Sequence, residues 1–161
     1  MSTRYRIMDE PRPGPLAAWA VDPLWPFLAL MMAGPWLGFP WFLFNGLAIG
    51  SARQKREVAW IAGGWLTLAA LYAGLFVLAE ALKLGRFELG YLRFGPIVWL
   101  MICGYALHFS QGRSAQLFAH FGGRLRQGWW VAILGGLVGR EQVAAALEKL
   151  PAGWFLKLVM A

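Results

Sequence analysis

The sequence predicts an all-α, polytopic membrane protein with three or four transmembrane helices, a proline-broken first span and an interfacial amphipathic helix. Of its 161 residues, 59% are hydrophobic and only 14% are charged, whereas a typical soluble domain carries about 25% charged residues. This leaves too little polar surface to solvate a globule. The longest apolar run, residues 58–82, would extend roughly 37 Å as a helix, which is enough to cross a hydrocarbon core of about 30 Å.

The chain divides by composition into three parts. Residues 1–22 form a polar, proline-rich N-terminal tail, residues 23–139 form the transmembrane domain, and residues 140–161 form an amphipathic C-terminal tail. The polar segments between apolar runs are too short for a separate soluble domain. Within the transmembrane domain the expected spans lie at about 23–50, 58–82, 89–109 and, as a short run, 128–139.

The first span is interrupted by proline. Asp22 and Pro23 mark its start, because aspartate caps a helix and proline suits the first helical position. Pro35 and Pro40 then each remove a backbone hydrogen bond. The segment is either one long kinked span or two half-helices in a re-entrant hairpin. We favour the kinked span, because irregular backbone at membrane depth needs surrounding protein that so short a chain barely supplies.

Residues 111–127 are predicted to form the interfacial helix. Apolar residues recur there at helical spacing, while the arginines lie mostly off that stripe, as is typical of a helix in the headgroup plane. The apolar run that follows, 128–139, reaches only about 18 Å as a helix. It either spans with its end at the interface or only dips into the membrane.

The basic balance, a formal charge of +7, indicates membrane lipids as partners and not nucleic acid. The basic residues flank apolar spans, where attraction to anionic headgroups accounts for them. Segment 51–57 has the highest density of positive charge, so we expect 51–57 and 111–127 to be cytoplasmic. The residues expected at lipid headgroups are Arg53, Lys55, Arg56, Arg113, Arg124 and Arg126.

No residue set in the sequence predicts catalysis, a cofactor or a metal. The chain lacks Gly-x-Ser-x-Gly, His-Glu-x-x-His and P-loop motifs, and the lone cysteine, Cys103, lies within an apolar run. Three polar residues are possible functional groups: Glu80, the only acid inside an apolar span, and the two histidines His108 and His120. The spacing of the histidines does not match a metal or haem site.

Glycine spacing predicts close helix packing. Small residues on one helix face let backbones approach, which favours association in lipid. The expected packing glycines are Gly34, Gly38, Gly46, Gly50, Gly63, Gly64, Gly135 and Gly139. Four tryptophans predicted to lie deep in the membrane need partners for their indole N–H groups: Trp36, Trp41, Trp65 and Trp99.

These patterns favour a small multi-pass protein of the cell inner membrane that acts as an accessory or assembly subunit of a larger membrane complex. Its partner would be another membrane protein, or the chain itself as an oligomer. A homo-oligomeric transporter or channel is the first alternative, and a lipid-modifying membrane enzyme is the second. A transporter should align polar residues along a helix face, and an enzyme should gather ionisable groups at one depth. The sequence shows neither pattern.

Overall fold

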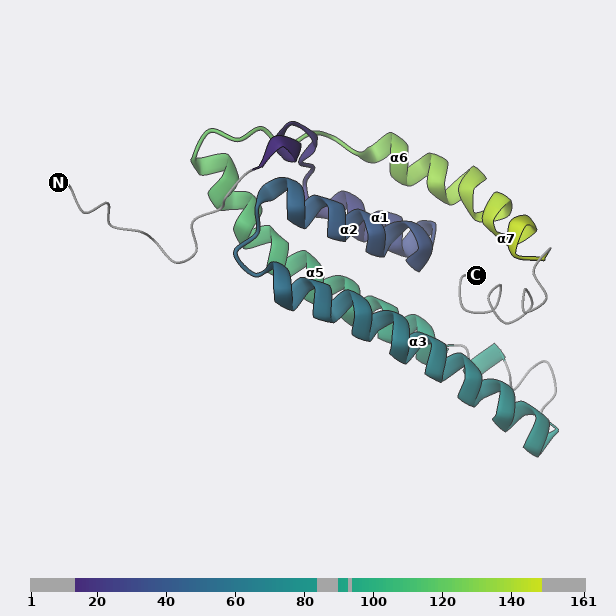
Figure 1. Ribbon diagram of the computed structural model, residues 1–161. Coiled ribbons are helices and arrows are strands. Elements are labelled where there is room, and N and C mark those ends of the chain that lie inside the picture. The colour runs from purple at the N-terminus through teal and green to yellow at the C-terminus, as the bar shows by residue number, and fades with distance from the viewer. Residues whose placement is uncertain (1–13, 84–89, 93, 149–161) are drawn as a thin grey trace.

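The computed structural model describes residues 14–83, 90–92 and 94–148, which form helices joined by short loops (Figure 1). Among these residues there is no strand, and one isolated bridge joins Val21 to Arg126, so the all-α prediction is confirmed. Most of the predicted N-terminal tail and the end of the C-terminal tail lie outside the described residues. In chain order the elements are η1 (Pro15–Trp19), α1 (Leu24–Met32), α2 (Pro35–Ile49), α3 (Gln54–Leu82), α5 (Phe94–His120), α6 (Trp129–Leu134), the π-helical turn η2 (Gly135–Gly139) and α7 (Arg140–Glu148).

Two of these helices, α3 and α5, are long and apolar enough to cross a membrane. The 29 residues of α3 extend roughly 43 Å at 1.5 Å per residue. The two helices run antiparallel, since Ser110 bonds to Glu57 at the start of α3, whereas the earlier Trp99 bonds to Gly64 further along it. The total number of spans stays a prediction.

Residues 23–50 form a hairpin of two short helices, not the single kinked span that the sequence favoured. Val21 donates a hydrogen bond to Asn45 (2.9 Å), and Leu30 packs on Gly38, so α1 and α2 run antiparallel. As helices they extend about 14 and 22 Å. Neither alone matches the thickness of a hydrocarbon core.

The turn between α1 and α2 explains why the chain reverses instead of bending. Gly34 has φ +98°, which only glycine adopts at little cost, and Pro35 then fits the first turn of α2, where its missing N–H is not needed. Pro40 remains inside α2. At the start of α1, Asp22 accepts a hydrogen bond from Leu24 N (2.9 Å). The helix begins one residue later than predicted, with Pro23 at the cap position and Leu24 as its first residue.

Helix α5 is longer than its sequence pattern predicted. It continues to His120, so the first part of 111–127 forms its last turns instead of a separate interfacial helix. The predicted interfacial helix assumed that the polar side faces lipid headgroups. In the structure the polar residues Ser110, Gln111 and Ser114 face the interior and are buried. After His120 and Phe121 the chain continues with a glycine pair, Gly122 and Gly123.

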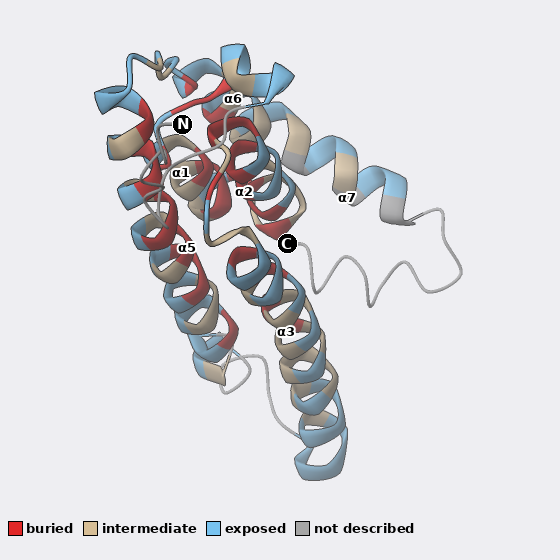
Figure 2. Cartoon of the chain, turned by 60° about the vertical axis from the view of Figure 1, so that its left-hand side comes forward, coloured by how far each residue is buried: buried red, intermediate tan, exposed pale blue. Residues whose placement is uncertain are grey.

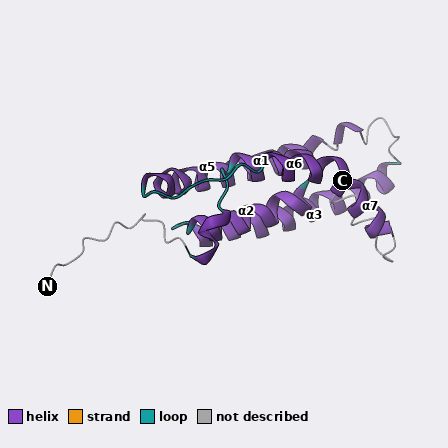
Figure 3. Ribbon diagram, turned by 90° about the horizontal axis from the view of Figure 1, so that it is seen from above, coloured by secondary structure: helices purple, strands orange, loops and turns teal. Residues whose placement is uncertain are grey.

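The helices form two layers when seen from above, with α5, α1 and α6 in one and α3 and α2 in the other (Figure 3). Helix α6 and the turn η2 follow α1 in the same direction, because Gly128 lies against Trp25 and Gly136 against Met32. The short apolar run 128–139 therefore accompanies the hairpin toward its tip.

Buried residues gather where the hairpin covers α3 and α5 (Figure 2). A cavity of about 220 Å³ at the hairpin tip is lined by Gly34 and Pro35 together with Leu68 of α3 and Pro96 of α5. The hairpin thus reaches only part of the way along α3. The main buried apolar cluster consists of Leu30, Phe39, Phe42, Ile61, Cys103 and Leu107.

Candidate functional site

A group of buried polar side chains lies where the end of α2, the first turn of α3 and the middle of α5 meet. Its members, which we call the polar cluster, are Asn45, Ser51, Glu57, Ser110, Gln111 and Ser114, and each is at most 7% exposed. Polar groups are rarely buried this deeply without hydrogen-bond partners. Here the partners come from segments far apart in the sequence.

Glu57 is the centre of the polar cluster and is only 2% exposed. Its Oε1 accepts hydrogen bonds from Ser51 Oγ (2.6 Å) and Ser110 Oγ (3.1 Å), and its Oε2 accepts one from Gln111 Nε2 (3.1 Å). An ionised carboxylate only accepts hydrogen bonds, so three donors suit the charged form. The first turn of a helix also favours negative charge.

The amides of Gln111 and Asn45 connect the carboxylate to the hairpin. Gln111 Nε2 donates a second bond to Phe42 O (2.7 Å), and Gln111 Oε1 accepts one from Asn45 Nδ2 (3.2 Å). Asn45 Oδ1 in turn accepts the bond from Val21 N. One continuous network therefore joins the segment before α1, α2, α3 and α5.

Ser51 connects the network to the loop between α2 and α3. Its Oγ lies 3.2 Å from Ser114 Oγ and accepts a hydrogen bond from Arg53 N (3.3 Å). Gly50 ends α2 with φ +71°, a left-handed conformation that glycine adopts readily. The loop and the start of α3 are thereby fixed to α5.

Gly46 is required by the same network. A Cβ atom at this position would lie 2.7 Å from Glu57 Oε2 and 2.9 Å from Gln111 Nε2. Both atoms take part in the hydrogen bonds of the polar cluster, so neither can move away freely. Gly46 therefore contacts polar side chains, and its contact lies within the chain.

Chemically, the polar cluster is suited to holding helices in register. Its groups are closed to solvent, and those that contact Glu57 all donate to it. A fully satisfied buried network specifies one arrangement of its helices, because any other arrangement leaves polar groups without partners. Removing one member leaves the others without a hydrogen-bond partner, which lowers the stability of the fold.

Most of the remaining predicted packing glycines contact side chains of other elements. Gly38 faces Leu30, and Gly64 faces the ring of Phe39. Gly135 faces Leu37, and Gly139 faces the ring of Trp36. Gly34 and Gly50 lie at the left-handed turn positions described above, and Gly63 has open space where a Cβ would stand.

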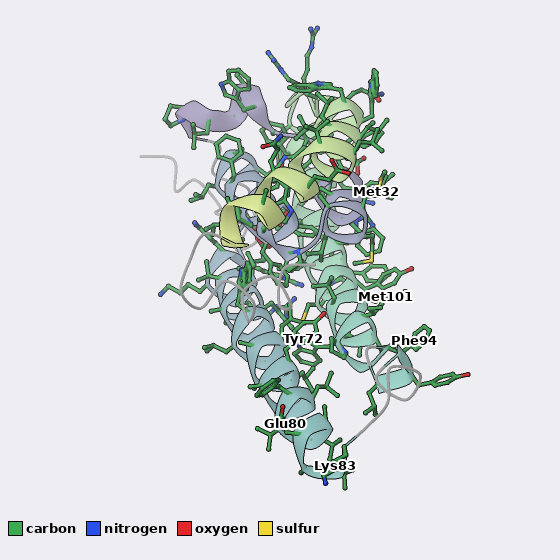
Figure 4. All side chains as sticks on the ribbon, turned by 90° about the vertical axis from the view of Figure 1, so that its right-hand side faces the viewer. Met32, Tyr72, Glu80, Lys83, Phe94 and Met101 are labelled. Carbon is green, nitrogen blue, oxygen red and sulfur yellow. The ribbon has the colours of Figure 1, made fainter. Side chains whose placement is uncertain are left out.

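The three possible functional polar residues do not come together. Glu80 is exposed and lies with Lys83 at the far end of α3 (Figure 4). His108 packs against Phe27 and is half-buried, and His120 is exposed at the end of α5. Among the described residues no three His, Cys, Asp or Glu side chains gather as a metal ion requires.

The basic residues predicted at lipid headgroups separate into groups. Arg53, Arg56 and Arg113 line adjoining hollows beside the first turn of α3. Arg124 and Arg126 line a different hollow of about 710 Å³, where Arg126 lies 5.3 Å from the centre of the Trp19 ring. Lys55 is exposed and lines none of these three hollows.

Two of the deep tryptophans differ in how their N–H groups are satisfied. Trp99 Nε1 donates to Gly64 O at 3.4 Å, which links α5 to α3. Trp36 Nε1 is buried and has no hydrogen-bond partner within the described part of the chain. Such an orphaned donor is uncommon inside a folded protein.

The sequence does not predict the polar cluster, because its pattern places Glu57 in the loop 51–57 and Gln111 in an interfacial helix. A usable signal existed: Ser110, Gln111 and Ser114 share one helix face if the helix is continuous. No protein family, curated protein or solved structure matches this chain.

Proposed function

We propose that this protein is a multi-pass protein of the cell inner membrane that acts as an accessory or assembly subunit of a larger membrane complex. Its contribution would be made by helix packing and not by chemistry. The observation that carries the proposal is the side of α3 that faces away from the polar cluster. There small residues alternate with exposed apolar ones.

That side, which we call the outer face of α3, consists of Gly63, Leu66, Ala70, Gly74 and Val77. Gly63, Ala70 and Gly74 are seven and eleven positions apart, close to two and three helical turns, so they align. A Cβ at Gly63 or Gly74 would meet nothing within 4 Å, while Leu66 is 73% exposed and Val77 is 64% exposed. In lipid such a surface favours a second helix over acyl chains, because small residues permit close backbone approach.

The membrane position is supported by the placement of charge along α3. Glu57 and the arginines lie at one end, and Glu80 and Lys83 lie at the other, about 34 Å of helix away. This separation suits one bilayer crossing. In this arrangement the α1–α2 hairpin enters the membrane from the end of the polar cluster and turns back inside it. Segments 51–57 and 111–127 would share the cytoplasmic side.

The decisive experiment is gentle extraction from native membranes into nanodiscs, followed by mass spectrometry of what copurifies. We expect this chain in a fixed ratio with a different membrane protein. The double variant Gly63→Leu/Gly74→Leu should lose that partner, because leucine side chains keep the helices apart. Gly95→Leu serves as the matched control, since that glycine also has open space but lies on α5.

Three results would contradict the proposal. Recovery as a stable monomer without a partner would exclude the accessory role. Recovery as a pure homo-oligomer would favour the transporter or channel alternative. Equal partner loss in Gly95→Leu would show that the outer face of α3 is not the contact.

A further inference from the structure

A basic groove runs along the surface beside the polar cluster, between the first turn of α3 and the later turns of α5. It consists of two adjoining hollows of about 450 and 550 Å³ that share Arg53 and Arg113 in their linings. Arg56 lines the larger hollow. Ser110 lines it as well, while its hydroxyl donates to Glu57, so the polar cluster lies directly behind the groove.

No acidic side chain among residues 14–83, 90–92 and 94–148 forms an ion pair with the arginines of the groove. Among the described residues, the nearby acid is Glu57, whose carboxylate is buried and already accepts three hydrogen bonds from the polar cluster. The guanidinium groups of Arg53, Arg56 and Arg113 form no ion pair with a described acidic side chain. A guanidinium fork matches the geometry of a phosphate group.

The imidazole of His108, beside the arginines, also lacks a hydrogen-bond partner among the described residues. His108 lines the larger hollow, and the atom that has no partner within the part of the chain that the structure describes is its buried Nδ1. Buried polar atoms without partners are uncommon, and each one needs a reason.

Below the arginines the surface becomes apolar and aromatic. Phe109, which lines the larger hollow, is 69% exposed, and Tyr105 one turn earlier on α5 is 47% exposed. Their ring centres lie 6.1 Å apart, and Ile102 extends the same surface with 48% exposure. A basic groove that continues into an apolar surface matches an amphipathic anion better than free phosphate.

We infer that this groove binds one anionic phospholipid. Arg53, Arg56 and Arg113 hold its phosphate, and an acyl chain lies along Phe109 and Tyr105. The polar cluster positions the site, because Ser51 accepts a hydrogen bond from Arg53 N, and Ser110 and Ser114 fix the turn of α5 that carries Arg113. The inference requires the membrane location proposed above but no protein partner.

Native mass spectrometry of the full chain in mild detergent tests this site, with phosphatidylglycerol and phosphatidylcholine as probes. We expect one saturable molecule of phosphatidylglycerol, bound with a Kd at least roughly tenfold lower than that of phosphatidylcholine. The variant Arg53→Gln/Arg113→Gln should raise the Kd for phosphatidylglycerol by about tenfold or more. Lys83→Gln/Arg140→Gln removes the same charge at the end of α3 and at the start of α7, away from the groove, and should leave the Kd unchanged.

Two further measurements sharpen the test. One distinguishes a specific site from general electrostatic attraction, and the other distinguishes binding of a lipid from binding of free phosphate. Arg113→Lys keeps the charge but loses the fork, so it should weaken binding by less than the double variant. Excess glycerol 3-phosphate should not displace the lipid, since it lacks acyl chains. Unsaturable binding, equal weakening in the control variant, or displacement by glycerol 3-phosphate would each overturn the inference. The lipid test uses the isolated chain, so it can succeed even where no protein partner copurifies.

Discussion

The two sides of α3 carry similar residues in opposite environments. On the inward side Glu57, Gly64 and Leu68 are buried against the hairpin and α5, and on the outer face Gly63 and Leu66 lie open. Gly63 and Gly64 are neighbours, yet a Cβ would meet nothing within 4 Å at the first and the ring of Phe39 at the second. Composition alone therefore does not define a packing surface. The neighbouring side chains on each side of α3 determine whether that side packs within the protein.

The largest expected difference between the two sides concerns leucine. Leu68 is 2% exposed, whereas Leu66 is 73% exposed. We expect Leu68→Ala to lower the free energy of unfolding by roughly 2–5 kcal/mol, because it leaves a cavity between α3 and its neighbours. Leu66→Ala should change it by less than about 0.5 kcal/mol in the isolated chain. Denaturant unfolding in detergent micelles measures both, and equal losses would contradict the assignment of sides.

A smaller difference is expected for the two glutamates of α3. Glu57→Gln keeps the shape of the side chain but replaces an acceptor oxygen by a donor next to the hydroxyls of Ser51 and Ser110. Charge-assisted hydrogen bonds contribute about 1.5–3 kcal/mol each, so a loss of that order is expected. Glu80→Gln, at the exposed end of the helix, should have little effect.

The outcome for Glu57 also tests whether the polar cluster needs its charge. Buried charges are sometimes replaced by neutral groups without loss of stability. Unfolding of Glu57→Gln at the same denaturant concentration as the unmodified protein would therefore show that the polar cluster is stable without the charge of Glu57. It would contradict the expectation that the charge of Glu57 stabilises the fold.

The sequence predicted helices far better than it predicted their contacts. The apolar run 58–82 defines most of α3, because its length and composition leave few alternatives. The turn at Gly34 and Pro35 is compatible with both a kink and a reversal, and packing of α1 on α2 decides between them. The polar cluster depends on segments 45–57 and 110–114 meeting in space. Local pattern places Ser110, Gln111 and Ser114 on one helix face but does not show which segment that face meets, so Glu57 resembles one more residue of a charged loop.

The smallest expected difference, and the closest comparison, is between Gly63 and Gly64. At Gly64 a Cβ would lie 2.8 Å from the ring of Phe39 and 3.4 Å from Cys103 Sγ. Gly64→Ala therefore forces the ring to shift, and we expect a net loss of about 1 kcal/mol, since overpacking outweighs the better helix propensity of alanine.

Gly63→Ala meets open space, so only the propensity term remains, and it should stabilise the isolated chain by up to roughly 1 kcal/mol. Thermal unfolding of both variants in the same detergent measures these stability changes. A gain for Gly63→Ala and a loss for Gly64→Ala would show that Gly64 packs inward while its neighbour Gly63 lies on the outer face. Should Gly63→Ala destabilise the isolated chain, the outer face must already be in contact with another part of this protein. The surface proposed for a partner would then be occupied from within.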